Sequence, residues 1–385
     1  MQKILHIGKY YPPYRGGMEE FLQVLLRGLA ENGSSQRALV HQHGGSSSRE
    51  RDGEIEIIRS RTFGRLLFVP LAPFFLWHLY REIRDYKPDL IHLHMPNASA
   101  LWLLLPLPGF WRCPWVVHWH SDVVFPARKI FHRLAYGLYR PLERRLLSRA
   151  AAIIVTSPPY LEHSEALRPF RDKCRVIPLT CESSPVPDEA AADTGSSGPD
   201  TGALKLLCVG RLTHYKGQGV LVAAVSKLVE SGCKVELVLA GGGENYESLR
   251  RQVAELGLED TVLLKGQVGE SELEELFLSC DLLCLPSLER SEAFGLVLLE
   301  AMARSKPALV TAVVGSGMSW VVEDGVTGWV VEPGNAAQLA ERLHWCQQHP
   351  EELKRAGRTG GQRYQDTFSR EKVVADTIEL YSELL

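Results

Sequence analysis

The stretch EAFGLVLLE, residues 292–300, is an apolar run with a glutamate at each end. The run continues through residues 301–303, and this length and composition predict a buried helix that starts near Gly295. Glu292 then lies just before the helix, and Glu300 lies inside it. A surface glutamate and a helix glutamate beside a core helix would give the same spacing, so the surroundings of the stretch decide its meaning.

Short apolar runs flank this helix and recur along the whole chain. They predict buried β-strands at residues 3–7, 38–41, 90–93, 115–118, 152–156, 205–209, 234–239, 262–265, 282–285 and 307–311. Segments with helical spacing separate these runs, for example residues 217–228 and 270–278. Because apolar strands alternate with helices, we expect an α/β protein with parallel sheets that are covered on both faces.

One segment divides the chain, because it is poor in large apolar residues and rich in Pro, Ser, Gly and Asp. It predicts a linker at residues 182–203. Residues 1–181 and 204–368 then form two doubly wound, Rossmann-like domains that we expect to face each other across a cleft. Residues 369–385 have helical spacing, and they either finish the second domain or cross back to the first.

The composition is that of a soluble globular protein, with 45% hydrophobic and 23% charged residues. The formal net charge of −3 argues against a general nucleic-acid binder. Eight scattered cysteines without C-x-x-C spacing indicate reduced thiols of a cytosolic protein. No secretory signal is evident, and no stretch reaches the roughly 20 apolar residues that a bilayer span needs.

The helix predicted after Gly295 has chemical consequences. Its first turn offers free backbone N–H groups and the positive end of the helix dipole, which suit a phosphate. An ionised carboxylate only accepts hydrogen bonds, so Glu292 and Glu300 suit the hydroxyl groups of a sugar. These residues predict a site for a sugar that is carried on a pyrophosphate.

Three other strand ends carry polar or glycine motifs. Gly16 and Gly17 follow the first strand, where adjacent glycines permit positive φ and close approach of a ligand to the backbone. His120 follows the strand at 115–118, where it could donate to a sugar hydroxyl or a phosphate. Arg211 and Lys216 flank the turn after the strand at 205–209, so they can converge on one anion.

The histidines near these strand ends have alternative interpretations. A structural role is an equal alternative for His120, and it is the preferred one for His92 and His94. His118 and His120 lie two apart on a strand and could face one metal ion, but no carboxylate or cysteine pattern completes such a site. The chain also contains no Asp-x-Asp, so we predict neither a metal nor a bound cofactor.

In their order along the chain these motifs resemble those of the large retaining glycosyltransferase family 4, whose members have the GT-B architecture. The sequence around these motifs, such as HIGKYYPP and GMSWVVEDGVTG, is most similar to that of bacterial mannosyl- and rhamnosyltransferases of polysaccharide assembly. The resemblance implies transfer of a hexose from a nucleotide sugar with retention of configuration. A diphosphate oxygen would take the proton of the acceptor, and no metal would be needed.

The resemblance also implies a role for each motif. The catalytic residues would be His120, Glu292, Arg211 and Lys216. The residues around the nucleotide sugar would be Gly16, Gly17, Arg211, Lys216, Gly266, Gln267, Phe294, Gly295, Leu296 and Glu300. Among these, Arg211 and Lys216 would hold the diphosphate and Glu300 the ribose. Glu292 and His120 would contact the transferred sugar, and the base would lie near Gly266.

The chain departs from the family pattern in two loops. After Ile177-Pro178 many relatives continue with Gly and Asn or Asp, whereas this chain has Leu-Thr-Cys at 179–181. After the strand at 307–311 many have Gly-Gly and then Glu, whereas residues 315–319 are GSGMS. The resemblance therefore does not predict whether the second loop contacts the sugar. Asp122 is the nearest candidate for a nucleophilic carboxylate in the first domain.

Residues 127–149 carry seven basic side chains against Glu143, and apolar residues recur there at helical spacing around Pro141. Together with the aromatic stretches at 68–77 and 101–115, they predict a first domain that rests on an anionic membrane surface. An ordinary core helix with a solvated face is the alternative. We expect a cytoplasmic protein, peripheral on the inner face of the cytoplasmic membrane.

The expected partners are a nucleotide sugar, of the GDP-mannose or GDP-rhamnose type, and a glycan or lipid-linked sugar acceptor, with no nucleic acid. Two other functions fit the same motifs. A nucleotide-sugar hydrolase or epimerase would turn over the donor without an acceptor. A non-catalytic nucleotide-sugar-binding component of a membrane assembly complex would bind it without turnover. The presence of both phosphate-side and sugar-side groups favours the transferase.

Overall fold

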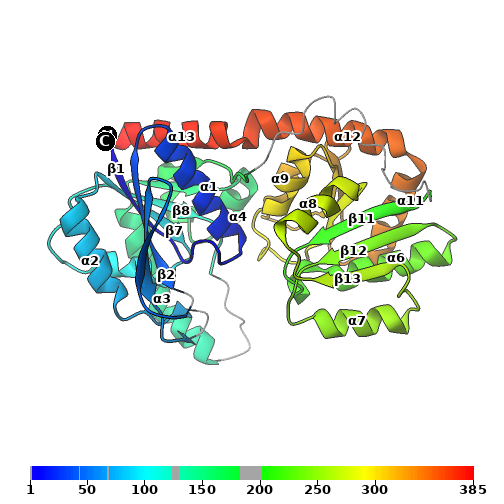
Figure 1. The fold of residues 1–385 in the computed structure, drawn as a ribbon, viewed down its shortest axis with the longest axis horizontal. Coiled ribbons are helices and arrows are strands. Elements are labelled where there is room, and N and C mark those ends of the chain that lie inside the picture. Colours follow the sequence, from blue (N-terminus) through cyan, green and yellow to red (C-terminus); the bar gives the residue numbers. More distant parts are fainter. Residues whose placement is uncertain (1, 43, 67–68, 124–129, 183–201) are drawn as a thin grey trace. The chain divides into compact units, whose positions relative to one another are not determined.

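The structure is a computed structural model that describes residues 2–42, 44–66, 69–123, 130–182 and 202–385. The described residues form two compact units (Figure 1). One consists of Met1–Cys181 with Ser369–Leu385, and the other of Glu182–Phe368. Most of the linker predicted at 182–203 lies outside the described residues.

The first unit is built on an eight-stranded sheet with the order β10-β9-β8-β7-β1-β2-β4-β3. All neighbouring strands pair in parallel except β3 and β4. The strands are β1 (Lys3–Ile7), β2 (Ser35–Gln42), β3 (Ser48–Asp52), β4 (Ile55–Arg61), β7 (Leu90–Met95), β8 (Trp115–Trp119), β9 (Ala152–Val155) and β10 (Cys174–Val176). A separate antiparallel ribbon consists of β5 (Arg65–Leu66) and β6 (Val69–Pro70).

Helices connect these strands. They are α1 (Gly17–Glu31), α2 (Phe75–Tyr86), η1 (Ala98–Leu104), α3 (Ile130–Arg149), α4 (Pro158–His163) and η2 (Arg168–Lys173). The last helix of the chain, α13 (Arg370–Leu384), packs against α1 in this unit. A Cβ on Gly28 of α1 would lie 2.4 Å from Val374 Cγ2, so glycine is what permits the close approach.

The second unit has a six-stranded, all-parallel sheet with the order β13-β12-β11-β14-β15-β16. Its strands are β11 (Leu204–Val209), β12 (Val235–Ala240), β13 (Val262–Gly266), β14 (Leu282–Leu285), β15 (Ala308–Thr311) and β16 (Gly328–Val331). Its helices are η3 (His214–Lys216), α6 (Gln218–Glu230), α7 (Tyr246–Glu255), α8 (Glu270–Ser279), α9 (Leu296–Ala303), α10 (Met318–Val321), α11 (Ala336–Gln348), α12 (Pro350–Arg363) and η4 (Tyr364–Phe368).

The strand orders place the sites in both sheets. In the first sheet, β2 to β4 lie on one side of β1, and the chain then crosses to β7 on the other side. In the second sheet, β12 and β13 lie on one side of β11, and the chain then crosses to β14 on the other side. Loops that leave the carboxyl ends of two such strands diverge, and ligands of doubly wound sheets bind there. The Gly16-Gly17 turn follows β1, the Arg211…Lys216 turn follows β11, and Glu292 follows β14.

All ten predicted strands are present, as are the two doubly wound sheets. Central strands of a parallel sheet are buried on both faces, so they appear in the sequence as continuous apolar runs. The predictions missed β3, β10 and β16, which lie at sheet edges, the short strands β5 and β6, and β4, in which the polar residues Arg59 and Ser60 are buried. All eight cysteines are free, and none of the described helices has the length and apolar character to cross a membrane.

Candidate functional site

The turn after β11 is attached to the segment after β14. Gly217 has φ +71°, and a Cβ there would lie 2.0 Å from the carbonyl oxygen of Pro286. The N–H of Leu288 donates to the carbonyl oxygen of Tyr215 over 2.7 Å. Both contacts fix Lys216 at the carboxyl ends of the neighbouring central strands β11 and β14.

Lys216 forms an ion pair with Glu292, and the two side chains are only 13% and 12% exposed. Burial is the largest single influence and would lower the pKa of Lys216. The charge of Glu292, the hydrogen bond to it and the nearby Tyr215 together outweigh burial, so the pKa is raised and the ammonium stays charged. The structure therefore brings together the residue expected on the phosphate side and the residue expected on the sugar side. Each neutralises the other in this state.

The loop with the unusual sequence GSGMS holds Glu292 in place. Ser316 Oγ donates to the carbonyl oxygen of Glu292 over 2.5 Å, and the N–H of Gly317 donates to that of Ala293 over 2.7 Å. Gly295 then takes φ +83° and packs against Leu285, so that α9 begins at Leu296 with Phe294 buried beside it. The helix predicted from residues 295–303 is confirmed, with Glu292 before it and Glu300 inside it.

The other predicted residues of this unit lie in segments that follow the carboxyl ends of its strands. Arg211 is exposed after β11, and its carbonyl oxygen accepts from the buried side chain of Gln218 over 3.0 Å. Gly266 ends β13 with φ +69°, and Gln267 follows it. Glu300 is partly buried within α9.

A glycine loop after β12 was not singled out from the sequence. A Cβ on Gly241 would lie 2.0 Å from Gly210 O, and one on Gly243 would lie 2.2 Å from Leu212 O. The loop therefore lies against the residues on either side of Arg211, and a Cβ on Gly242 would be 3.2 Å from the side chain of Gln267. Three consecutive glycines directly after a strand were the signal that could have revealed it.

In the first unit, Gly16 and Gly17 lie at the start of α1, but neither takes the left-handed φ that adjacent glycines permit. Gly16 has φ 167°, which is extended backbone. Its small size matters instead, because a Cβ there would lie 2.4 Å from Glu19 Oε2. The carbonyl oxygen of Gly16 accepts from the N–H groups of Glu19 and Glu20, which closes the first turn of the helix.

His120 follows β8 and belongs to a cluster of buried histidines. The cluster consists of His6, His92, His94, His118 and His120. Burial lowers the pKa of His6 and of His120 to about 3 and lowers the pKa of the other three well below 6.5, so all five are neutral at pH 7. A structural role for His92 and His94 was expected, whereas the participation of His6 was not.

Two groups of three histidines have ring nitrogens within 4.8 Å of one another, a set that could hold a metal: His6, His92 and His94, and His94, His118 and His120. Ring geometry does not favour coordination in the second group. The planes of His118 and His120 lie within 5° of each other at a centroid distance of 4.3 Å. The lone pairs of an imidazole lie in its ring plane, so those of two parallel, stacked rings do not converge on one ion.

Asp122, the candidate nucleophile of the first unit, has structural partners. Its Oδ1 atom accepts from Trp119 Nε1 over 2.8 Å and from Ser164 Oγ over 2.7 Å. The N–H of Asp122 donates to the hydroxyl of Tyr160. These bonds tie the end of β8 to the segment after β9.

Replacing Gly217 by alanine is expected to lower the stability of the second unit by about 2–4 kcal/mol, because left-handed φ strain and a backbone clash act together. Gly257→Ala is the matched control, since Gly257 has φ +65° but nothing within 4 Å of an added Cβ. That variant should lose only about 1 kcal/mol. Denaturant unfolding measures both, and equal losses would contradict the role given to the contact with Pro286.

Two doubly wound sheets, with the Lys216–Glu292 pair at the carboxyl ends of the strands of the second, are the architecture of the GT-B class of glycosyltransferases. The model of the glycosyl transferases group 1 matches residues 191–363, and that of a glycosyl transferase 4-like domain matches residues 16–180. The chain belongs to this family of glycosyltransferases.

Individual relatives agree with the family. The chain is 29% identical to O-antigen chain mannosyltransferase C of Escherichia coli, over 100% of this chain and 99% of the relative. It is 31% identical to the D-rhamnosyltransferase WbpZ of Pseudomonas aeruginosa, over 76% and 73%. Among solved structures, sucrose-phosphate synthase from Thermosynechococcus elongatus has the same fold, with a TM-score of 0.81, 24% identity and coverage of 100% and 99%.

Proposed function

We propose that this glycosyltransferase moves a hexose, of the mannose or rhamnose type, from a GDP-linked sugar to a glycan or lipid-linked acceptor of a bacterial surface polysaccharide. The reaction retains the anomeric configuration and needs no metal. The observation that carries the proposal is the Lys216–Glu292 pair where β11 and β14 are neighbours, because it sets a phosphate ligand beside an acceptor for sugar hydroxyls. The names of the two relatives support the class of sugar.

Each remaining residue has a proposed part. Arg211 and Lys216 hold the diphosphate, and the charge that develops on it is stabilised by both cations and by the N–H groups of Phe294, Gly295 and Leu296. The resemblance to the family gives the backbone of Gly16 and Gly17 a further part in binding the diphosphate. Glu300 binds the ribose, and Gly266 and Gln267 lie beside the base. The engagement of Asp122 with Trp119 and Ser164 supports a mechanism without a carboxylate nucleophile from this strand end.

A thermal-shift panel of GDP, UDP, ADP and TDP, with and without magnesium, tests the donor site. A nucleotide at about 100 times its Kd should add about 2.7 kcal/mol of stability. We expect stabilisation by GDP alone and no dependence on magnesium. Stabilisation by another base would correct the donor, and a strict requirement for magnesium would contradict the metal-independent mechanism.

A turnover assay of the donor without acceptor separates the transferase from the hydrolase. Release of free sugar at the full rate without acceptor would indicate the hydrolase instead.

We also propose that the first unit rests on an anionic membrane. Its surface carries an aromatic patch of Phe63, Leu71, Phe74 and Trp77, each 44–54% exposed. The rings of Phe63 and Phe74 lie 6.0 Å apart. Arg61 lies 4.6 Å from the ring centre of Phe63, and Arg81 lies 5.5 Å from that of Trp77. Aromatic rings beside guanidinium groups are typical of the lipid headgroup region.

The double variant Phe74→Ser/Trp77→Ser should reduce co-sedimentation with anionic liposomes at low salt about tenfold or more, because two large apolar side chains leave the bilayer interface. Leu256→Ser/Leu263→Ser, which changes two exposed leucines of the second unit, is the control and should bind like the unaltered protein. Failure of the unaltered protein to bind such liposomes would refute the membrane proposal and leave the transferase site untouched.

A further inference from the structure

We propose that a directional chain of hydrogen bonds through Gln36, His6 and His94 fixes the tautomer of His120, so that its Nδ1 atom serves as a hydrogen-bond acceptor for a hydroxyl group of the ligand. Gln36, His6 and His94 are positioning residues in this arrangement. The identification of that hydroxyl with the transferred sugar rests on the proposed function, whereas the tautomer itself does not.

The chain starts at a backbone carbonyl, which gives it a direction. Ser34 Oγ donates to the carbonyl oxygen of Leu29 over 2.6 Å, so its oxygen is available as an acceptor. Gln36 Nε2 donates to Ser34 Oγ over 2.7 Å. The amide orientation of Gln36 follows from this bond, and its Oε1 atom is the one that faces His6.

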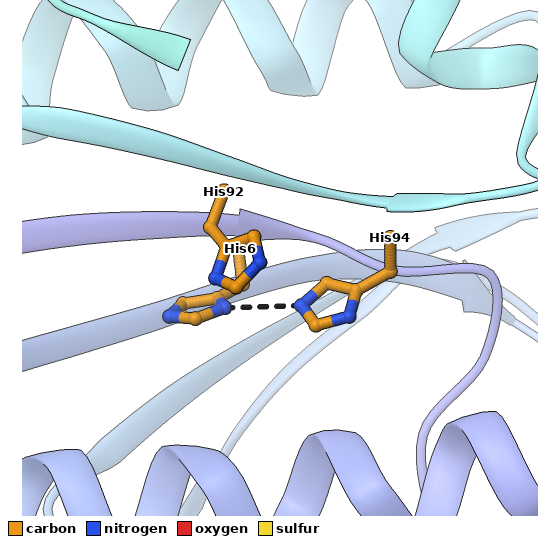
Figure 2. A group of neighbouring side chains, drawn as sticks. All are labelled: His6, His92 and His94. Carbon is orange, nitrogen blue, oxygen red and sulfur yellow. Dashed lines mark hydrogen bonds between the residues drawn. The ribbon is translucent and has the colours of Figure 1, made fainter. Parts of the chain in front are cut away.

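The tautomers of the histidines follow one after another. Gln36 Oε1 only accepts, so His6 Nε2, at 2.8 Å, carries the hydrogen and His6 Nδ1 is bare. His94 Nε2 lies 3.2 Å from His6 Nδ1 and must therefore donate (Figure 2). His94 Nδ1 is then bare, and His120 Nε2, at 3.2 Å, donates to it. His120 Nδ1 is left with a lone pair and no hydrogen.

The ring geometry agrees with this chain. The centroids of His6 and His94, and of His94 and His120, are 5.5 Å apart with planes tilted by 27° and 22°. Centroids so much farther apart than the bonded nitrogens indicate rings that meet edge to edge, as an N–H···N bond requires. The assignment needs neutral rings, which the burial of all three histidines favours.

His120 Nδ1 is buried and has no hydrogen-bond partner among the described residues. An unpaired buried acceptor costs about 1–3 kcal/mol, so a partner supplied by a ligand is favoured at this atom. Because Nδ1 only accepts, that partner must be a donor such as a hydroxyl, not a phosphate or carbonyl oxygen. The sequence had led us to expect a donating His120, and the direction of the chain reverses that expectation.

The chain orients His120 and does not carry a proton away. Its far end consists of the amide of Gln36, the hydroxyl of Ser34 and a backbone carbonyl, none of which takes up a proton near neutral pH. A proton accepted at His120 Nδ1 would remain within the buried histidines, where burial disfavours the charge. The accepting group therefore aligns a hydroxyl and is not a general base.

Nuclear magnetic resonance of the full-length protein without substrate tests the tautomer directly. Histidine labelled with 15N gives long-range ¹H–¹⁵N correlations in which protonated and bare ring nitrogens have different shifts, and loss of signals in His120→Asn assigns the residue. We expect one neutral form of His120 with the hydrogen on Nε2. A hydrogen on Nδ1, a charged ring or an even mixture of tautomers would overturn the proposal.

Two matched variants test the chain. His6→Phe keeps an aromatic ring but removes the acceptor for His94, so His120 should shift to the other tautomer or to a mixture. His118→Phe removes an equally buried histidine whose ring has no hydrogen-bond partner among the described residues, and it should leave the tautomer of His120 unchanged. Equal effects of both, or none from His6→Phe in a folded protein, would contradict the chain. The wild-type spectrum decides the tautomer even if His6→Phe fails to fold.

Two further readouts separate this proposal from its alternatives. Once the donor is known, His6→Phe should lower kcat/KM about tenfold, the value of about one hydrogen bond, while His118→Phe should not. One equivalent of Zn²⁺ should leave the spectrum unchanged. Joint shifts of the His94 and His120 nitrogens on adding Zn²⁺ would make them metal ligands and overturn the hydrogen-bond chain. Absence of any nucleotide binding would refute the proposed function without affecting the tautomer.

Discussion

Glu292→Gln is expected to lower sugar transfer at least about 100-fold while leaving the affinity for the nucleoside diphosphate unchanged or raising it. The substitution keeps the shape of the side chain but removes the charge that we propose aligns the sugar hydroxyls, and a small misplacement of a reacting group has effects of this size. It also removes the partner that neutralises Lys216 in the structure. The freed ammonium should then bind the diphosphate about 3- to 10-fold more tightly.

Initial rates with the donor and calorimetric titration with the nucleotide measure the two effects separately. Glu289→Gln is the matched control, because Glu289 lies on the same loop but is exposed, and it should behave like the unaltered protein. Lys216→Met should also lower the rate, by about 10²–10³, but it should weaken nucleotide binding where Glu292→Gln does not. Transfer at the full rate in Glu292→Gln would show that the proposed role of Glu292 is wrong.

The partnership between Lys216 and Glu292 shows where inference from the sequence ended. Both residues were predicted to be functional, and the strands before them were predicted correctly. Their contact joins positions 76 residues apart, and it exists because β11 and β14 are neighbours in the sheet. Strand order is decided by the packing of the connecting helices, which apolar runs do not encode. The hydrogen bond from Ser316 to the backbone of Glu292 was not predicted for the same reason, since the loop of Ser316 follows a third strand, β15.

The histidine chain was missed through strand pairing. His6 was one polar residue in an apolar strand and had no reason to be singled out. In the sheet, β1 lies next to β7 and β7 next to β8, and the registers place His6 opposite His92 and His94 opposite His118. Residues that are far apart in the sequence therefore share one layer. The tautomers of these histidines could be assigned only from the hydrogen bonds of the Ser34 and Gln36 side chains, which the sequence does not reveal.

Acid is expected to unfold the first unit at a mildly low pH, while the second unit persists. The five clustered histidines have lowered pKa values when folded, about 3 for His6 and His120, against an ordinary value of 6.5. Below pH 6.5 the unfolded chain binds protons that the folded chain cannot bind. Stability is thus fully present above 6.5 and is lost as the pH falls toward the folded values.

The size of the effect follows from the number of groups. Each histidine loses about 1.4 kcal/mol per pH unit once the pH is well below 6.5, and five of them sum to about 10 kcal/mol by pH 5. That is comparable to the whole stability of a domain, about 5–15 kcal/mol. None of the buried histidines of the described residues lies in the second unit, so the same cause of acid instability is not present there.

Hydrogen exchange resolved by peptide, recorded from pH 7.5 to pH 4.5, locates the loss. We expect protection to disappear first in β1, β7 and β8, with the midpoint between about pH 6 and pH 5. His118→Phe removes one of the five titrating groups and breaks no hydrogen bond within the described part of the chain, so its midpoint should lie at lower pH. His163→Gln, at an exposed position of the same unit, should leave the midpoint unchanged. If the second unit lost protection first, or if His118→Phe did not shift the midpoint, the neutral buried cluster would not be what limits acid stability.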